Sequence, residues 1–364
     1  MKVVFILNLF CEPNSIKRIN EFQARGYDVE AYGFDRHLSI NNQPDGVEVQ
    51  IVGDFSNSLP YLKRLPIIYK GIRKVLQKTS HQECLYFLRG LEVALCFLAL
   101  SRRKYIYEEA DMVHVNFNNH LIKRFMEMMD KMVIKKSLLS VFLSEGYVKY
   151  HFGNQIPTNV HVIPNKLNPI ILNCPYVSSK KLDVQRIKIG FVGLIRYRSI
   201  FNFARVFCHY FPQGEFHFYG IFSCEEDEKI FYSLKKYKNC FFHGKYTNPQ
   251  DLPHIYSQID MVLSTYDVDK ENVRYAEPNK IYEAIYFETP IIVSSRTYLA
   301  EKVERMGIGY AIDAMNNDDV VRFISQLTER DLQRKIDNTR KIDKRDVINI
   351  NNTFFEKLKS LGNM

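Results

Sequence analysis

The sequence predicts an α/β protein built from two doubly wound domains, each a parallel sheet covered by helices, that face a cleft. Short apolar runs typical of buried strands alternate with longer amphipathic stretches, which is the pattern of βαβ units. The pattern occurs twice, before and after a segment of linker composition at 169–183. A length of 364 residues suits two domains, and 46% hydrophobic with 25% charged residues is typical of a globular chain.

The first domain is expected over residues 1–168. Gly26 is a helix stop signal, and Pro66 is expected to interrupt the longest helix. The predicted strands are 2–7, 29–34, 83–88 and 138–144, residues 104–111 form a strand followed by an acidic turn, and residues 160–168 close this half. The predicted helices are 15–26, 59–78, 90–101 and 117–137.

The second domain is expected over residues 184–339, with amphipathic helices between its strands. The charged segment at the end of the chain has a helical period, and its last part, about 340–364, is a candidate to pack back on the first domain. The predicted strands are 187–193, 215–220, 239–244, 260–266 and 290–295.

Composition excludes some classes of protein. No apolar run reaches the ~18 residues of a membrane span, and the start, MKVVFILNLFCEPNS, fits a first strand better than a signal peptide, since it has one Lys, a short apolar run and no cleavage site. The seven Cys are scattered without CxxC spacing, which favours reduced thiols in a cytoplasm over disulfides or a zinc site. The net charge of +9 is compatible with nucleic acid, an anionic membrane or an anionic small molecule.

The stretch EPNKIYEAIYFETPII, 277–292, carries a pattern suited to a sugar phosphate. Pro278 suits the first position of a helix. Asn279, Lys280 and Glu283 then share one face of that helix. Lys280 and the helix N-terminus favour a phosphate, and the Glu283 carboxylate can accept two hydrogen bonds from a ribose diol.

The stretch GFVGLIRYR, 190–198, predicts the opposite wall of the site. Gly193 at a strand end lets the backbone approach a ligand closely. Arg196 and Arg198 follow it, and either guanidinium can bind a phosphate with two hydrogen bonds. Taken alone, Lys280 and Glu283 also fit a surface ion pair. Together with the domain layout, the two stretches favour a site for a phosphate ester.

These residues resemble those of retaining family 4 glycosyltransferases with the GT-B fold. In the second half the resemblance is carried by GFVGLIRYR, DMVLSTY, PNKIYEAIYFETPIIVS and YLAEKVERMGIGYAID. In the first half it is looser and is carried by KVVFILNLF, IYEEAD and SVFLSEGYVKYHF. The resemblance covers nearly the whole chain, is specific in the PNKxxE segment, and implies a fold of two Rossmann-like domains.

The resemblance also implies roles at a sugar-nucleotide donor. Glu283 would hold the ribose, and the loop HGKYT, 243–247, which contains Tyr246, would receive the nucleobase. The diphosphate would be held by Lys280, Arg196, Arg198 and the backbone of Gly193 and Asn279.

The motif departs from the family pattern at one position. The fuller family motif has a second Glu earlier in the chain, where this sequence has Tyr275, and Glu277 lies two positions away. Glu277 either caps the helix or stands in for the missing Glu at the donor sugar. The candidate catalytic residues are therefore Arg196, Lys280 and Glu277. In the retaining mechanism the leaving diphosphate is commonly proposed to take the acceptor proton, so no protein nucleophile is needed.

Acidic residues at strand ends of the first half are candidates to orient an acceptor hydroxyl. They are Glu108, Glu109, Asp111 and Glu145, and helix N-caps are an equally good interpretation of each. His114 and His120 are expected to be structural or exposed.

Two further patterns can be interpreted as ordinary structural features without a functional role. Asp267 and Asp269 form a DxD sequence in a polar loop, but the metal-dependent enzymes that use it have another fold, so we expect neither a metal nor a cofactor. The basic and apolar stretch at 60–78 fits either a helix lying on a membrane surface or an ordinary helix with a solvated face.

The predicted function is transfer of a sugar, with retention, from a UDP- or GDP-sugar to a saccharide or lipid-linked acceptor. The resemblance places it in bacterial surface polysaccharide assembly, such as capsule or O-antigen, in the cytoplasm or at the inner face of the cell membrane. The alternatives are a nucleotide-sugar epimerase or hydrolase of the same fold, and a non-enzymatic basic binding protein. No nucleic-acid motif is present, so nucleic acid is not an expected partner.

Overall fold

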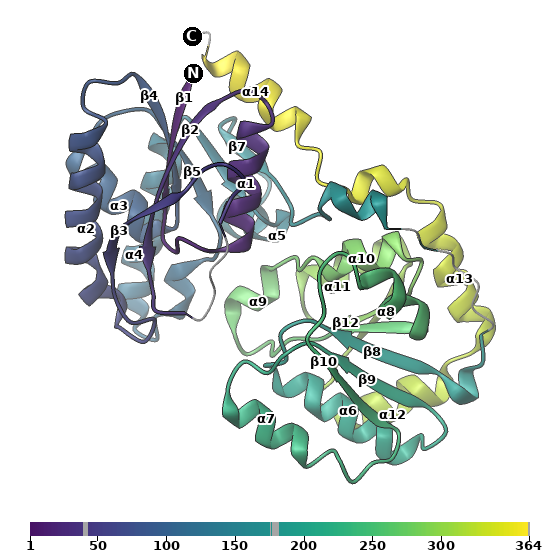
Figure 1. Ribbon diagram of the computed structural model, residues 1–364. Coiled ribbons are helices and arrows are strands. Elements are labelled where there is room, and N and C mark those ends of the chain that lie inside the picture. Colours follow the sequence, from purple (N-terminus) through teal and green to yellow (C-terminus); the bar gives the residue numbers. More distant parts are fainter. Residues whose placement is uncertain (39–42, 175, 177–181, 363–364) are drawn as a thin grey trace. The chain divides into compact units, whose positions relative to one another are not determined.

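The computed structural model describes residues 1–38, 43–174, 176 and 182–362. These form two compact units (Figure 1). The first comprises Met1–Ile163 with Asn351–Met364, and the second comprises Pro164–Ile350. Each unit contains one parallel sheet, which confirms the predicted α/β fold class.

The first unit has a seven-stranded parallel sheet in the order β3-β2-β1-β4-β5-β6-β7. Apolar residues of β1 pack against α1 and α14, so the core is rich in aromatic rings such as Phe5, Phe22 and Phe355. The strands are β1 (Lys2–Leu7), β2 (Asp28–Asp35), β3 (Val49–Asp54), β4 (Cys84–Arg89), β5 (Tyr105–Glu109), β6 (Leu139–Phe142) and β7 (Val160–Val162).

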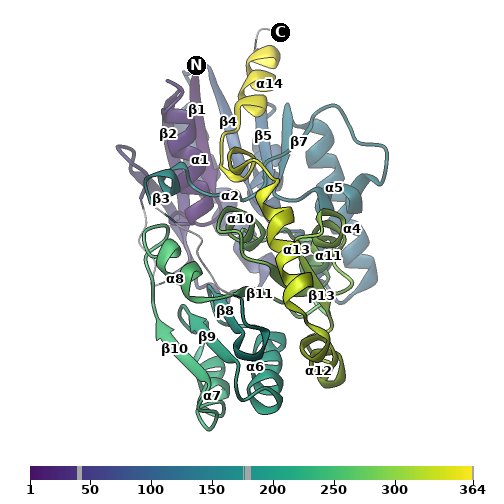
Figure 2. The same ribbon diagram turned by 90° about the vertical axis from the view of Figure 1, so that its right-hand side faces the viewer.

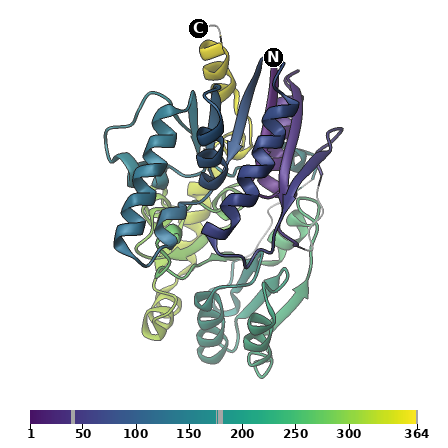
Figure 3. The ribbon, with the colours of Figure 1, turned by 90° about the vertical axis from the view of Figure 1, so that its left-hand side faces the viewer.

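Helices cover both faces of this sheet. α2 and α3 pack side by side, with α4 next to α3, and Figure 3 shows this group in blue and teal. The helices are α1 (Pro13–Gln23), α2 (Tyr61–Lys78), α3 (Leu91–Leu100), η1 (Val113–Asn116), α4 (His120–Lys136), α5 (Glu145–Phe152) and α14 (Asn352–Gly362). α2 continues through Pro66, which the sequence analysis expected to interrupt it.

The second unit has a six-stranded parallel sheet in the order β10-β9-β8-β11-β12-β13. Its strands are β8 (Lys188–Val192), β9 (Glu215–Tyr219), β10 (Cys240–Gly244), β11 (Met261–Ser264), β12 (Ile291–Ser294) and β13 (Gly309–Ile312). The strand order reverses between β8 and β11, and ligands of such sheets bind beyond the carboxyl ends of the strands at this switch point.

Two hydrophobic clusters cover the faces of this second sheet. α6 and α12 pack together on one face, and α8, α10 and α11 contribute to the other. The helices are η2 (Pro169–Asn173), η3 (Val184–Arg186), α6 (Arg198–Tyr210), α7 (Glu225–Tyr232), α8 (Leu252–Gln258), α9 (Glu271–Tyr275), α10 (Lys280–Tyr286), α11 (Tyr298–Met306), α12 (Asn317–Gln326), α13 (Glu329–Arg340) and η4 (Lys344–Val347).

The boundaries between the units differ from the predicted ones. Residues from Pro164 to the start of the predicted linker 169–183 belong to the second unit, because Leu167 and Ile171 are buried in its core. Within that linker, residues 175 and 177–181 lie outside the described residues.

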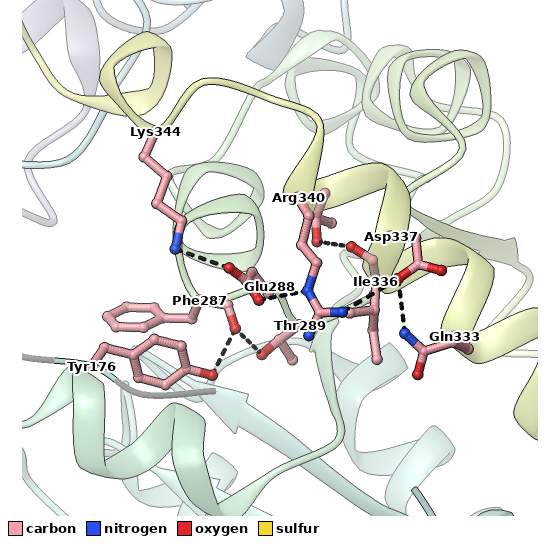
Figure 4. Close-up of polar contacts among 10 residues, drawn as sticks. Tyr176, Phe287, Glu288, Thr289, Gln333, Ile336, Asp337, Arg340 and Lys344 are labelled. Carbon is pink, nitrogen blue, oxygen red and sulfur yellow. Dashed lines mark hydrogen bonds and ion pairs between the residues drawn. The ribbon is translucent and has the colours of Figure 1, made fainter. Parts of the chain in front are cut away.

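The second unit also extends further along the chain than position 339. Glu288 at the end of α10 accepts hydrogen bonds from Arg340 Nε at 2.9 Å and Lys344 Nζ at 3.0 Å (Figure 4). These ion pairs hold the end of α13 and η4 on the second unit. Of the described residues in the segment expected to pack back, those of α14 lie on the first unit (Figure 2). There the rings of Phe354 and Phe355 contact Phe22.

Candidate active site

Three consecutive strands of the second unit end in glycine. Gly193, Gly220 and Gly244 follow or close β8, β9 and β10 with φ values of 145°, 143° and 78°, which side-chain-bearing residues rarely adopt. Gly193 N donates to Tyr219 O at 2.8 Å, and Gly220 N donates to Gly244 O at 2.8 Å. Backbone therefore packs directly on backbone at the carboxyl edge of this sheet.

Gly220 is the most constrained of the three. A Cβ built on it would lie 1.8 Å from the carbonyl oxygen of Gly193, so no side chain fits there without moving one of the two strands. We expect Gly220→Ala to displace Gly193 and to lower both the melting temperature and the affinity for the donor. Thermal unfolding and ligand titration measure the two effects. Gly26→Ala is the matched control, because Gly26 has a φ of 78° and no neighbour within 4 Å. Equal losses in the two variants would contradict the close-packing explanation.

Lys280 and Glu283 form a buried ion pair at the first turn of α10. Lys280 Nζ lies 2.9 Å from Glu283 Oε1 and 3.0 Å from Oε2, so the ammonium bridges both carboxylate oxygens. Burial lowers the pKa of Lys280, but the charge and hydrogen bonds of Glu283, together with Tyr246 and Tyr266, outweigh it, so the pKa lies above its ordinary value. Lys280 therefore carries a permanent positive charge.

The structure brings Lys280 next to Gly193. A Cβ on Gly193 would lie 3.6 Å from Lys280 Cε and 4.0 Å from Nζ. The two stretches singled out in the sequence therefore meet at the switch point of the sheet. Because α10 has only seven residues, the charge of Lys280 rather than a helix dipole is the main attraction for an anion here.

Glu283 has different hydrogen-bond partners from the ribose hydroxyls that the sequence analysis expects. Its side chain is fully buried. Besides Lys280, its carboxylate accepts from Asn279 Nδ2 at 3.1 Å and from the Tyr256 hydroxyl at 2.7 Å. In this arrangement Glu283 positions the ammonium of Lys280, with Asn279 and Tyr256 holding the carboxylate in place.

Arg196 extends the positive wall beyond Gly193. Its guanidinium lies over the ring of Tyr197, with 4.9 Å between Cζ and the ring centroid, and its side chain is exposed. The Tyr197 ring contacts Tyr266, which follows β11, at a centroid distance of 4.8 Å. Burial raises the pKa of Tyr266, while the charges of both Lys280 and Arg196 act on it in the opposite direction. Tyr266 therefore lies within electrostatic reach of both cations.

The DxD sequence has a structural role at its first residue. Asp267 Oδ1 accepts from the backbone N–H of Ser199 at 2.9 Å, and Oδ2 accepts from that of Arg198 at 3.2 Å. Asp267 thus occupies the N-terminus of α6, where a carboxylate is favoured. The Arg198 side chain is exposed, as is Asp269.

Glu277 lies in a second buried ion pair. Its Oε1 accepts from Lys302 Nζ of α11 at 2.8 Å and from the Tyr282 hydroxyl. Glu277 makes no cap hydrogen bond to α10. The N-cap of this helix is Asn279 and its first residue is Lys280, so the prediction that Pro278 occupies the first helical position was wrong. These contacts connect the start of α10 to α11. The catalytic role expected for Glu277 stays a prediction.

Tyr246 is half-buried near the ion pair of Lys280 and Glu283. Burial raises the pKa of its hydroxyl, Lys280 lowers it and Glu283 raises it, which places this side chain within electrostatic reach of both. The loop 243–247 and the PNKxxE segment are therefore neighbours.

The candidate acceptor residues of the first unit divide into two pairs. Glu108 is buried between Arg18, whose Nε lies 3.1 Å from Oε2, and Arg89. Glu109 is fully buried beside His151, so neither carboxylate reaches the surface. Asp111 and Glu145 are exposed. Glu145 begins α5, but Ser144 provides the N-cap, with its Oγ accepting from Gly146 N at 2.9 Å.

Sequence reasoning missed Gly220, Tyr256 and Tyr266. Gly220 and Tyr266 end the predicted strands EFHFYG and DMVLSTY, so their position at the carboxyl edge was a usable signal. Tyr256 lies on α8, and nothing in its local sequence indicates that its hydroxyl meets Glu283.

Comparisons with known proteins agree with this fold. Sucrose-phosphate synthase from Thermosynechococcus elongatus is similar at a TM-score of 0.72 and 14% identity, covering 100% of this chain and 98% of that one. Anabaena HepE in complex with UDP and glucose has a TM-score of 0.69 and 15% identity, covering 99% and 100%. WaaG, a glycosyltransferase involved in lipopolysaccharide biosynthesis, has a TM-score of 0.62 and 14% identity, covering 95% and 97%. At these identities the likeness shows the fold.

The fold is that of GT-B glycosyltransferases, and the match of residues 207–357 to a glucosyltransferase-like domain agrees with the resemblance found in the sequence. Residues 207–357 match the family model "Glucosyltransferase 3-like, C-terminal domain". No curated protein matches the chain in sequence.

Proposed function

We propose that the protein transfers a sugar, with glucose the first candidate, from a UDP-sugar to a saccharide or lipid-linked acceptor. The observation that carries the proposal is the Lys280 ammonium held by Glu283 beside Gly193. A glucosyltransferase 3-like domain and a neighbour crystallised with UDP and glucose support this donor.

Lys280 and Arg196 stabilise the departing nucleotide diphosphate. As the bond between the sugar C1 and the diphosphate oxygen breaks, negative charge develops on that oxygen, and fixed cations lower the energy of this state. The acceptor hydroxyl forms the new C1–O bond on the same face of the sugar, and its proton passes to the diphosphate. This course retains the anomeric configuration and needs no protein nucleophile.

Incubation of the purified chain with UDP-glucose and a panel of other UDP- and GDP-sugars tests the proposal. We expect slow release of UDP from one UDP-sugar without an acceptor. Nuclear magnetic resonance should show that the first sugar product keeps the donor's anomeric configuration. An epimerised nucleotide sugar, or no consumption of any donor together with no nucleotide binding, would contradict the proposal.

The acceptor part of the proposal rests on a basic and apolar surface of the first unit. The sequence of α2 contains six Lys or Arg and no acidic residue. On α4, Leu121, Phe125 and Met128 are 76%, 55% and 57% exposed. A groove of about 360 Å³ between α2, α3 and α4 is lined by Leu62, Leu65, Leu95, Leu98, Ala99, Phe125, Met126, Met129, Met132 and Lys136, with Tyr61.

This combination fits the surface of an anionic bilayer, since the cations attract lipid headgroups and the apolar side chains enter the interface. The helices in the described part of the chain are all too short or too polar to cross a membrane. We therefore infer peripheral contact with the inner face of a bacterial cell membrane. A lipid-linked acceptor for surface polysaccharide would be available there.

Co-sedimentation with phosphatidylglycerol vesicles tests this surface. We expect binding at low salt that falls as salt rises, because headgroup attraction is screened. Replacing Leu121 and Phe125 by Ser should weaken binding by about tenfold, since each buries apolar area in the interface. The same change at Ile221 and Ile230, which are 52% and 41% exposed on the second unit, is the control. Equal binding of both double variants would show that α4 does not touch the bilayer.

A further inference from the structure

The first unit contains a buried polar cluster that the proposed reaction does not use. Its members come from four segments that meet beneath the carboxyl end of β5. Each has at most 6% of its surface exposed. They are Tyr107 and Glu109 of β5, His114 of η1, Asp130 of α4 and His151 of α5.

Four members have side-chain atoms without a hydrogen-bond partner among the described residues. These atoms are both ring nitrogens of His114, Oδ2 of Asp130, Nδ1 of His151 and Oε2 of Glu109. Leaving a buried polar atom unpaired costs about 1–3 kcal/mol. His114 Nδ1 and Asp130 Oδ2 are 3.4 Å apart but lack hydrogen-bond geometry. The cluster therefore lacks the partners that a folded interior normally supplies.

The geometry points to a metal site. His114, Asp130 and His151 each offer one ligand atom, and these three atoms lie within 4.8 Å of one another. Two ligands of a tetrahedral zinc ion are about 3.4 Å apart, given metal–ligand bonds of ~2.1 Å. We propose that these three side chains bind one divalent transition-metal ion, with zinc the best match to two imidazoles and a carboxylate.

The remaining members are placed as outer partners of the ligands. The Tyr107 hydroxyl donates to Asp130 Oδ1 at 2.9 Å, which leaves Oδ2 for the ion. Glu109 Oε1 is hydrogen-bonded to His151 Nε2 at 3.1 Å, which leaves Nδ1 of that imidazole for the ion. Carboxylates that orient a metal-bound imidazole in this way are a regular feature of metal sites.

A divalent cation also suits the carboxylates of the cluster. Glu109 and Asp130 are both fully buried. An isolated buried carboxylate is strongly disfavoured unless it is paired or binds a metal. The ion would tie η1, α4 and α5 to β5, and so it would support the strand end that carries the exposed Asp111.

This inference departs from the sequence analysis, which expected no metal and a structural or exposed role for His114. The ligands lie at positions 114, 130 and 151, a spacing that matches no common zinc-binding pattern. Only the fold brings them together.

Elemental analysis of the full chain, expressed without a histidine tag in medium containing zinc, tests the inference. We expect about one equivalent of zinc per chain after gel filtration, because the three ligands are buried and exchange of the ion with solvent should be slow. Asp130→Asn should reduce the content to below about a tenth of an equivalent, since it removes the anionic ligand. The control is His217→Asn, which breaks the pair formed by His217 Nδ1 and His243 Nε2 at 3.0 Å and should leave the zinc content unchanged.

A second measurement on the wild-type chain covers the case in which Asp130→Asn fails to fold. Chelator-treated protein should regain melting temperature on addition of zinc, and addition of cobalt should give the visible absorption of a tetrahedral site. Zinc content near zero with no thermal shift, or zinc that is lost from His217→Asn and kept by Asp130→Asn, would overturn the proposal. The first of these results would leave two buried histidine–carboxylate contacts.

Discussion

Lys280→Met is expected to reduce kcat/KM for the sugar-nucleotide donor by about 10²–10³-fold, the usual cost of removing one fixed stabilising group at a developing anion. The Lys280 ammonium bridges both oxygens of Glu283 and lies beside Gly193 at the switch point of the second sheet. Met keeps most of the side-chain volume and removes the charge. Initial rates of UDP release at several donor concentrations measure the effect.

The matched control for this prediction is Lys238→Met. Lys238 is exposed and follows α7 in the same unit, so its replacement removes the same net charge away from the site. We expect its kcat/KM to equal that of the wild type. If Lys280→Met retained full activity while its unfolding was unchanged, the assignment of Lys280 to the leaving diphosphate would be wrong.

Glu283→Gln is expected to destabilise the fold and to impair donor binding together. Removing one partner of a buried ion pair leaves the other charge unpaired, which costs about 3–5 kcal/mol. Here the unpaired charge is Lys280, and the single amide oxygen of Gln can accept from either Tyr256 or Asn279 but not from both. Denaturant unfolding measures the stability, and calorimetric titration with UDP measures binding.

The double variant Lys280→Met with Glu283→Gln separates the two effects. With both charges removed, we expect the chain to regain part of the lost stability and to remain inactive, because no ammonium faces the diphosphate. A double variant that regained no stability would mean that Glu283 stabilises the fold through Tyr256 and Asn279 instead. A double variant that regained activity would contradict the role of the ion pair in catalysis.

Much of the fold could be predicted because buried parallel strands appear as short apolar runs between amphipathic helices. β1, β8 and β9 all fall within the predicted runs. β3 was missed because it is an edge strand with exposed positions, so it lacks an apolar run. β13, GYAI, was missed as well: it is an edge strand of its unit's sheet, and its two central residues are only half-buried. The boundaries between the units depend on side-chain packing, as at Ile171 and Glu288, and no local pattern shows it.

Part of the candidate site could also be predicted, because some of its residues have local sequence signals. Gly193, Lys280 and Glu283 have local signals: a strand-end glycine and an i,i+3 pair at a helix start. The depth of Glu283 could not be predicted, because its burial depends on Tyr256 from α8, which is distant in sequence. Glu109 looked like an acceptor-side carboxylate, whereas the fold buries it against His151.

Calorimetric titration of the full wild-type chain with UDP, GDP and uridine, repeated on Lys280→Met, tests the central claim most directly. We expect UDP to bind with a micromolar dissociation constant, GDP and uridine to bind at least about tenfold more weakly, and Lys280→Met to weaken UDP to the level of uridine, since one charged contact to phosphate is worth ~1.5–3 kcal/mol. UDP binding that is equally tight in Lys280→Met, or no nucleotide binding by the wild type, would contradict the account.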